Sequence, residues 1–355
     1  MRTFFFASIL LLCCTAQALA EEIPLPDPGF KIVAPLPEDR PIRARAGQYA
    51  GAIYDTHVHL FHQGGTVRPE EIGAEAAKAG VERVVLLPTP NDGIMKDRGQ
   101  NTAARDRLAR KHPDQFKQLC GSEEFTTWMN KAYAEGYDQG DLEHRLEALA
   151  RRIDAGECAG IGEIGPYHFD KKDGQKTIHF PMNFEPMLRL AGLAAAKGVP
   201  LDMHAEPRTR DGKNFEREVF GGIELLYREH PDLVLILSHT GMTSAANLRA
   251  MLLRYPRMMT NIKAVSDGKA LHWSHLGPVV NPDGELYEDW AALFEEMPER
   301  FMVGTDARFG EAQYTSGRYA GRDIKRIRLL LGSLTPYAAE CIASANAHQV
   351  FGTGE

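Results

Sequence analysis

Two histidines stand one residue apart in the apolar stretch YDTHVHLF, residues 54–61. Alternate side chains of a β-strand point to the same side, so His57 and His59 would share one face, with Asp55 one step deeper. Two neutral imidazoles on one rigid edge can supply half of a metal site. The pair can also arise by chance or as hydrogen-bonded core, so by itself it leaves both interpretations open.

Four further residues with metal-ligand chemistry each follow an apolar run. They are Glu163 in AGIGEIG, His204 in PLDMHAEP, His239 in LVLILSHTG and Asp306 in FMVGTDARF. A polar side chain at such a position is costly unless it is paired. Each one alone could be a satisfied polar residue at a strand end. The six residues together favour a metal site.

These residues need elements that bring them together. From Ala52 onward, short apolar runs alternate with amphipathic helical patterns. The runs predict strands at 52–59, 81–88, 115–120, 158–164, 200–205, 233–239, 258–264 and 301–305. Helical patterns lie between most of them, and several end at a proline or glycine just before the next strand, as in REHPDLV and KGVPLDM. Eight such units predict a (β/α)8 TIM barrel, in which catalytic groups gather at the carboxyl ends of the strands.

The chain divides into three parts. Residues 1–20 are expected to be a signal peptide, 21–50 an extended proline-rich arm, and 51–355 one barrel domain that ends in a closing helix. Arg2, the run FFFASILLLCC and the small residues of AQALA predict export, with cleavage after Ala20. We expect a soluble periplasmic or secreted protein, since no later segment is long and apolar enough to cross a membrane.

Charge and cysteine content limit the function classes. The formal net charge is −7, and loss of Arg2 with the leader makes it −8, so no electrostatic argument supports a nucleic-acid partner.

Cys120 should end one parallel strand and Cys158 begin the next, at opposite ends of the sheet and roughly 20 Å apart. We therefore expect buried free thiols at both positions. A bond between Cys158 and Cys341 is left open.

Several motifs together resemble the amidohydrolase superfamily of barrel hydrolases. They are DTHVHLF, GIGEIG, DMHAEP, LSHTG and GTDARFG, and the terminal AECIASANAHQVFG resembles the amidohydrolase-related branch. GIGEIG resembles the TatD-type branch, although GEIGPYHF stands where that branch has GEIGLDY. The resemblance implies that His57, His59 and Asp306 hold one metal and that His204 and His239 hold a second. Glu163 would bridge the two metals or bind beside them.

The resemblance also implies an activity. We expect a divalent metal, zinc and two per chain, with manganese or another divalent ion as alternatives. A metal-activated water would attack an ester, lactone, amide or phosphoester bond of a small-molecule substrate, and Asp306 would take its proton. Lys263, Arg208 and Arg308 are candidates for binding a substrate carboxylate or phosphate. Lys263 could equally point outward.

Two other hypotheses for the function stay open. A mononuclear lyase (decarboxylase) of the amidohydrolase-related branch would use His57, His59, His204 and Asp306. A non-enzymatic binding protein could have kept the barrel and lost its activity. A homo-oligomer is possible. The segment 166–183 is a candidate substrate cover, and Tyr167, His168 and His272 are expected to be solvated loop residues.

Overall fold

The computed structural model describes residues 23–34, 39–61, 68, 71–90, 102–169, 177–209, 211–263, 278–311 and 314–352. The expected signal peptide and His272 lie outside the described residues, as do parts of the arm and of the expected substrate cover. All eight expected strands lie within the described part of the chain, apart from residue 264 at the end of the strand expected at 258–264.

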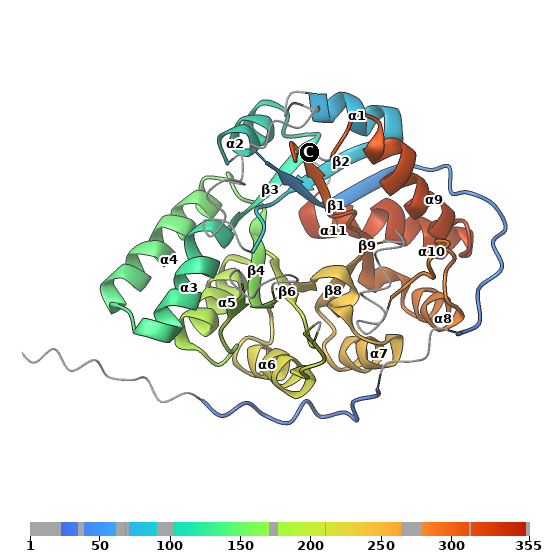
Figure 1. Ribbon diagram of the computed structural model, residues 1–355. Helices are drawn as coiled ribbons and strands as arrows, with labels where there is room; N and C mark the ends of the chain where they lie inside the picture. The colour runs from blue at the N-terminus through green and yellow to red at the C-terminus, as the bar shows by residue number, and fades with distance from the viewer. Residues whose placement is uncertain are drawn as a thin grey trace, which may run out of the picture.

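The strands form a closed parallel barrel (Figure 1). They are β1 (Ile53–Leu60), β2 (Val81–Leu86), β3 (Phe116–Gly121), β4 (Gly160–His168), β6 (Leu201–Ala205), β7 (Leu235–Leu237), β8 (Met258–Ile262) and β9 (Phe301–Val303). Pairing of Asp55 in β1 with Val303 in β9 closes the ring. Each of the eight lies at the position expected from its apolar run, which confirms the predicted fold. The short strand β10 (Ala307–Phe309) continues along β1 beyond β9.

Helices cover the outside of the barrel between successive strands (Figure 1). They are α1 (Ile72–Ala79), α2 (Thr102–Lys111), α3 (Ser122–Glu135), α4 (Gln139–Asp154), α5 (Glu185–Lys197), α6 (Glu216–Glu229), α7 (Ala245–Arg254) and α8 (Glu288–Glu296). After β10 come α9 (Lys325–Leu331), α10 (Pro336–Glu340) and α11 (Asn346–Phe351). The expected closing helix is thus made of α10 and α11, joined by the helical segment Cys341–Ala345.

Local sequence accounts for these helices, as α4 and α5 illustrate. The Asp138 carboxylate caps α4 by accepting a hydrogen bond from the Asp141 N–H, and leucines at spacings of three and four face the core. Gly198 ends α5 in the left-handed conformation with φ 64°. Among the described residues, no helix combines the length and apolar character that crossing a membrane would need.

The proline-rich arm lies along the outside of the barrel, past α6 and α7 and then around α8 and α9 (Figure 1, blue). Asn247 of α7 holds it by accepting the Val33 N–H at 2.8 Å and donating to the Val33 carbonyl at 3.0 Å. Farther along the arm, Arg40 pairs with Asp289 of α8 at 2.8 Å. The arm therefore ties several helices of the barrel together.

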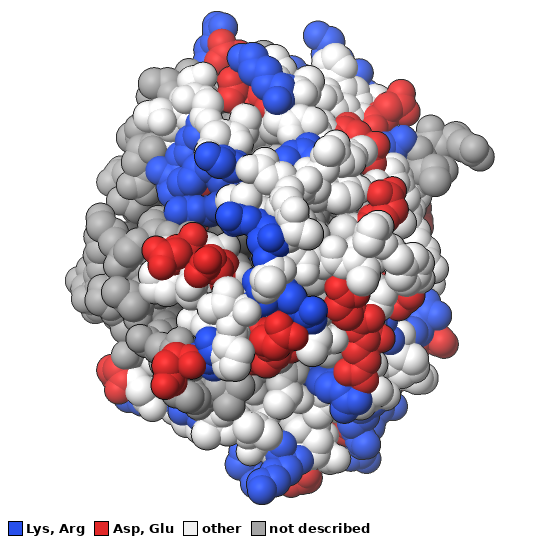
Figure 2. Space-filling view, turned by 90° about the vertical axis from the view of Figure 1, so that its right-hand side faces the viewer, with Lys and Arg blue, Asp and Glu red and all other residues white. Residues whose placement is uncertain are grey.

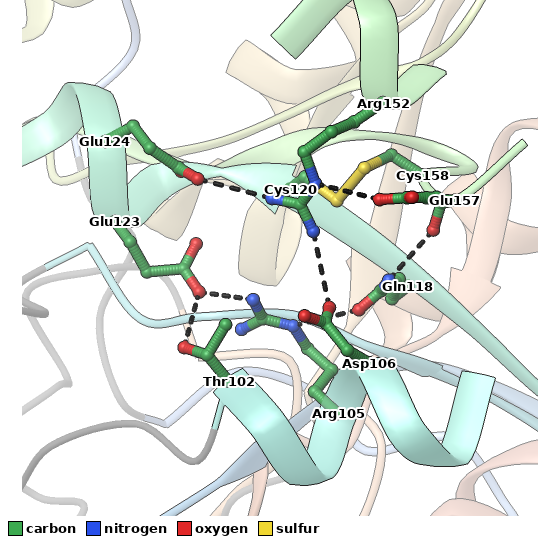
Figure 3. The surroundings of a disulfide bond; sticks show 10 residues. All are labelled: Thr102, Arg105, Asp106, Gln118, Cys120, Glu123, Glu124, Arg152, Glu157 and Cys158. Atoms are coloured by element: carbon green, nitrogen blue, oxygen red, sulfur yellow. Dashed lines mark hydrogen bonds and ion pairs between the residues drawn. A yellow bond between two sulfur atoms is a disulfide. The ribbon is translucent and has the colours of Figure 1, made fainter. Parts of the chain in front are cut away.

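The expectation of free thiols at Cys120 and Cys158 is wrong, because the two residues form a disulfide (Figure 3). The barrel strands are staggered, so that Leu119 near the end of β3 pairs with Gly160 at the start of β4. The chain also bends on both sides of Cys158. The two Cα atoms consequently lie 5.8 Å apart, within reach of a disulfide. Without the stagger, the end of β3 and the start of β4 would lie too far apart to be bridged. Cys341 is a buried free cysteine.

Candidate metal centre

The six candidate ligands meet at the carboxyl ends of five strands. His57 and His59 lie on β1, Glu163 on β4 and His204 on β6, while His239 lies in the turn after β7 and Asp306 between β9 and β10. Five of them are at most 8% exposed, and the Asp306 side chain is 11% exposed. The alternation of β1 turns both of its imidazoles inward, and their ring centroids lie 4.9 Å apart.

The Glu163 carboxylate lies between two pairs of histidines. Its Oε2 is 3.5 Å from His57 Nε2 and 3.7 Å from His59 Nε2. Its Oε1 is 2.8 Å from His204 Nδ1 and 3.6 Å from His239 Nε2. One carboxylate thus presents a separate oxygen to each pair.

Asp306 completes the group on the β1 side. Its Oδ1 lies 3.1 Å from His59 Nε2. The other ring nitrogen of His59, Nδ1, donates to the Leu87 carbonyl at 2.8 Å, which directs Nε2 toward Glu163 and Asp306. Of the described residues, three mutually close sets share these six ligands: His57–His59–Glu163, His57–His239–Asp306 and Glu163–His204–His239.

The backbone takes uncommon conformations where it delivers these side chains. His239 and Asp306 have φ of 57° and 54°, values that cost a non-glycine residue about 1–3 kcal/mol. The Asn261 side chain holds His239 by accepting its N–H at 2.9 Å, and the His57 carbonyl accepts the Asp306 N–H at 2.9 Å. The surrounding hydrogen bonds therefore fix both ligands in place.

Gly162, just before Glu163, allows β4 to approach β6 closely. Its φ is 146°, and a Cβ there would lie 2.7 Å from the Asp202 Cβ. Only glycine fits such a position without a shift of one strand.

Two buried carboxylates, Asp55 and Asp202, contact residues that carry or neighbour the candidate ligands. Asp55 accepts hydrogen bonds from the Thr305 N–H at 2.9 Å and from the Tyr319 hydroxyl at 2.8 Å, and so holds the turn that carries Asp306. Asp202 accepts from the Ser238 hydroxyl at 2.6 Å, and its Oδ2 lies 3.8 Å from His57 Nδ1.

The electrostatics favour ionised carboxylates among cations. Burial alone would raise the pKa of Glu163, but His57 and His204 hold it well below its usual range. Burial works against protonation of His204, yet the Glu163 carboxylate raises the pKa of that imidazole to about 9. Burial would likewise raise the pKa of Asp306, and the neighbouring Lys263 and His59 hold it well below the usual value. Both carboxylates are therefore available to a cation.

This donor set fits a divalent metal. His57 Nε2 is a buried nitrogen with no hydrogen-bond partner, and it points toward the Glu163 carboxylate. Burial and the nearby Lys263 ammonium lower the pKa of His239 well below its usual value, so this imidazole is neutral, as a ligand must be. Imidazole and carboxylate ligands suit zinc and several other divalent ions.

The three candidate substrate residues take different places. Lys263 follows β8 and points to the site, where its ammonium pairs with Asp306 Oδ2. Arg208 pairs with Glu216 at 2.7 Å, and Arg308 pairs with Glu311 at 2.7 Å. Both guanidiniums thus have carboxylate partners outside the six-ligand group.

Sequence reasoning missed three residues that contact the ligands: Asp202, Glu206 and Asn261. Asp202 and Glu206 flank His204 at spacings of two, so strand alternation could have placed them on its face. The expectation of a solvated loop was wrong for Tyr167, which is fully buried, because β4 continues to His168 and pairs with β5 (Ile178–His179). His168 is partly buried, and its ring lies 4.8 Å from that of His204.

Solved structures share this barrel. One is a probable 2-pyrone-4,6-dicarboxylic acid hydrolase from Acinetobacter baumannii, with 14% identity, 84% of this chain and 99% of that chain covered, and a TM-score of 0.52. An uncharacterised TIM-barrel protein from Bordetella bronchiseptica has 13% identity, coverages of 85% and 99%, and a TM-score of 0.51. A β-aspartyl dipeptidase from Fervidobacterium islandicum has 16% identity, coverages of 85% and 74%, and a TM-score of 0.50.

No family model and no curated protein sequence match the chain. At these identities the structural likeness shows the fold alone. The shared fold is a (β/α)8 barrel, which is the fold that the resemblance predicted from the motifs implies.

Proposed function

We propose that this protein is an exported metal-dependent hydrolase that adds water across an ester, lactone, amide or phosphoester bond of a small molecule. The observation that carries the proposal is the Glu163 carboxylate, which presents one oxygen to His57 and His59 and the other to His204 and His239. Such a carboxylate is suited to binding two cations side by side. Two of the structural neighbours carry the names of hydrolases, which agrees with the proposal.

Each residue then has a role. His57, His59, Glu163 and Asp306 would hold one divalent ion, and Glu163, His204 and His239 the second. Bound divalent ions, zinc by preference, lower the pKa of water toward about 7 and stabilise the oxyanion that develops on the substrate. Asp306 accepts the proton of the attacking water and passes it to the leaving group. Lys263, which pairs with Asp306, would bind an anionic group of the substrate.

Two features support export and a small-molecule substrate. The buried disulfide between Cys120 and Cys158 is of a kind that persists in oxidising compartments. On the face shown in Figure 2, Lys and Arg side chains lie among Asp and Glu side chains and many uncharged ones. That mixture and the negative net charge favour no nucleic-acid partner.

Metal analysis of the zinc-loaded mature protein, combined with assays on esters, lactones, amides, phosphoesters and aromatic acids, tests the proposal. We expect two zinc equivalents per chain and hydrolysis of one of the first four classes. A single equivalent with decarboxylation of an aromatic acid would assign the mononuclear lyase instead. Metal binding without turnover of any class would favour a binding protein. A Glu163→Ala variant should lose metal and turnover, and unchanged turnover would remove the case for a shared carboxylate.

A further inference from the structure

Glu206 is a buried carboxylate to which the proposed reaction assigns no role. It lies two residues beyond His204, just past the end of β6, and is 3% exposed. A carboxylate is seldom buried to this extent without a partner that stabilises its charge. Its surroundings therefore indicate what it does.

Both Glu206 oxygens face donors. Oε1 lies 3.2 Å from His204 Nε2, and Oε2 accepts the Phe169 N–H at 3.3 Å. The Glu206 N–H donates to the Tyr167 carbonyl at 2.7 Å, which fixes its backbone to β4. The side chain is thus held between β4 and the imidazole of His204.

Each ring nitrogen of His204 consequently faces a different carboxylate. Its Nδ1 is 2.8 Å from Glu163 Oε1, inside the six-ligand group, and its Nε2 faces Glu206, outside that group. The His168 ring, 4.8 Å away, packs against the same imidazole. An ionised carboxylate only accepts hydrogen bonds, so both ring nitrogens face acceptors. A metal held by Nδ1 would need the lone pair of that nitrogen, and the one remaining ring proton would then lie on Nε2, where Glu206 accepts it.

We propose that Glu206 is a positioning residue that keeps the proton of His204 on Nε2 and thereby leaves Nδ1 as the metal ligand. The inference deepens the proposed function and rests on a metal at His204. His59 is arranged in the same manner, with its outer nitrogen donating to a backbone carbonyl. Partners of this kind fix the tautomer and orientation of a ligating histidine, and their loss costs about 10–100-fold in metal affinity.

Glutamine cannot replace Glu206 in this arrangement. A carboxylate accepts from His204 and from the Phe169 N–H at once, whereas an amide of the same shape has one accepting and one donating end. If the amide nitrogen faced His204, it would donate to Nε2 and move the ring proton to Nδ1. If it faced Phe169, it would oppose another N–H group. Glu206→Gln therefore changes hydrogen bonding at nearly constant volume.

The test is zinc binding by the mature protein, measured by competition with a chromophoric chelator and by metal analysis. Glu206→Gln should weaken one zinc equivalent by about 10–100-fold and leave the other near its wild-type affinity. Glu224→Gln is the control, because Glu224 is also buried, at 8% exposure, but binds Arg254 on the outside of the barrel. Glu224→Gln should leave the affinity for each zinc equivalent within about twofold of the wild-type value. This change is much smaller than the loss of about 10–100-fold expected when a ligating histidine loses its partner.

The outcomes separate this inference from the proposed function. Wild-type protein that binds no zinc would overturn both. Wild-type protein that binds zinc with an affinity unchanged by Glu206→Gln would overturn the role of Glu206 alone. Complete loss of one equivalent, with the remaining zinc unaffected, would make Glu206 a ligand in its own right, with His168 and His204, and would also overturn the positioning role.

A second measurement does not require Glu206→Gln to fold. In ¹⁵N spectra of the zinc-loaded wild-type protein, the His204 signals can be assigned by their absence in His204→Gln. We expect a protonated Nε2 and a metal-bound Nδ1. A bare or metal-bound Nε2 would contradict the proposal.

Discussion

At the scale of single residues, the candidate metal centre depends on where charges and protons are placed. Glu163 and Asp306 are buried, yet neighbouring cations hold the pKa of each carboxyl well below its usual range. The ring nitrogens of His59 and His204 that face away from the six-ligand group have acceptors of their own. The two carboxylates are thus ready to receive a cation, whereas His204, whose pKa is, despite burial, raised to about 9 by Glu163, would give up a proton when a metal binds.

Asp306→Asn tests the proton transfer. Asparagine has nearly the same shape but cannot accept a proton, so kcat should fall by about 10²–10⁴ on whichever bond the wild-type protein hydrolyses. The measurement is kcat at saturating zinc, so that a weaker metal affinity is compensated. Asp232→Asn, in an exposed turn, is the control. Unchanged kcat in Asp306→Asn would assign the proton to another group.

At the scale of elements, ion pairs join the helices that surround the barrel, and the guanidinium of one of them, Arg105, is buried. Around the disulfide, Arg105 of α2 pairs with Glu123 of α3, and Arg152 of α4 reaches Asp106 and Glu124 at 3.3 Å each (Figure 3). The disulfide joins β3 to the entry of β4, the strand that carries Glu163. This region therefore supports one of the ligand-bearing strands.

Loss of the disulfide should lower the free energy of unfolding. The cross-link joins residues that are 38 apart in sequence, and it restricts the unfolded chain. Its removal should lower the free energy of unfolding by about 2–4 kcal/mol. Urea unfolding with and without a reductant provides the measurement. Reductant should destabilise the wild-type protein and have no effect on the Cys120→Ala/Cys158→Ala variant. A wild-type midpoint that reductant does not move would contradict the estimate.

Glu224 should make stability depend on pH. Its carboxylate accepts from Arg254 of α7 at 2.6 and 2.9 Å and from the Tyr255 hydroxyl at 2.6 Å. The hydrogen bond from Arg254 lowers the pKa of Glu224 below the unfolded-state value of 4.5. The stabilisation is therefore present above about pH 4.5 and is lost as the pH falls through the folded-state pKa.

Glu224→Gln should thus be less stable than the wild-type protein by about 1.5–3 kcal/mol at pH 7. The difference should shrink as the pH is lowered toward 3, which urea titrations at several pH values would show. Glu229→Gln, exposed on the same helix, is the control. A difference that stays constant with pH would argue against an ionic contribution.

At the scale of the whole molecule, the arm and the C-terminal helices hold the barrel from outside. The arm runs past α6 and α7 and on to α9, where Arg328 donates to the Tyr49 carbonyl at 3.0 Å. Asn346 at the start of α11 donates to the carbonyls of Pro298 and Phe301, next to β9. Segments at both ends of the described chain therefore contribute to the stability of one closed ring.

Asn247→Ala should release the arm. The substitution leaves the Val33 N–H and carbonyl without their side-chain partners and removes a buried amide, at a cost of about 1–3 kcal/mol. We expect a lower unfolding midpoint and faster proteolysis within residues 23–34. Val33→Ala keeps both backbone groups and is the matched control. Equal cleavage rates in the two variants would show that Asn247 does not hold the arm.

The amino-acid sequence by itself determined the barrel and the identity of the six candidate ligands. Apolar runs of strand length, punctuated by proline and glycine, specify eight buried parallel strands, and a ligand-type residue after such a run lies at the carboxyl end of its strand. These signals are local, because burial and backbone periodicity act over a few residues.

Only the tertiary structure decided which groups meet. Strand stagger brings Cys120 to Cys158, since a register between strands depends on closure of the whole ring and not on either strand alone. The same closure places Glu163 between two histidine pairs and Glu206 against His204. Contacts of this kind span strands and loops, and local pattern carries no information about distances between them.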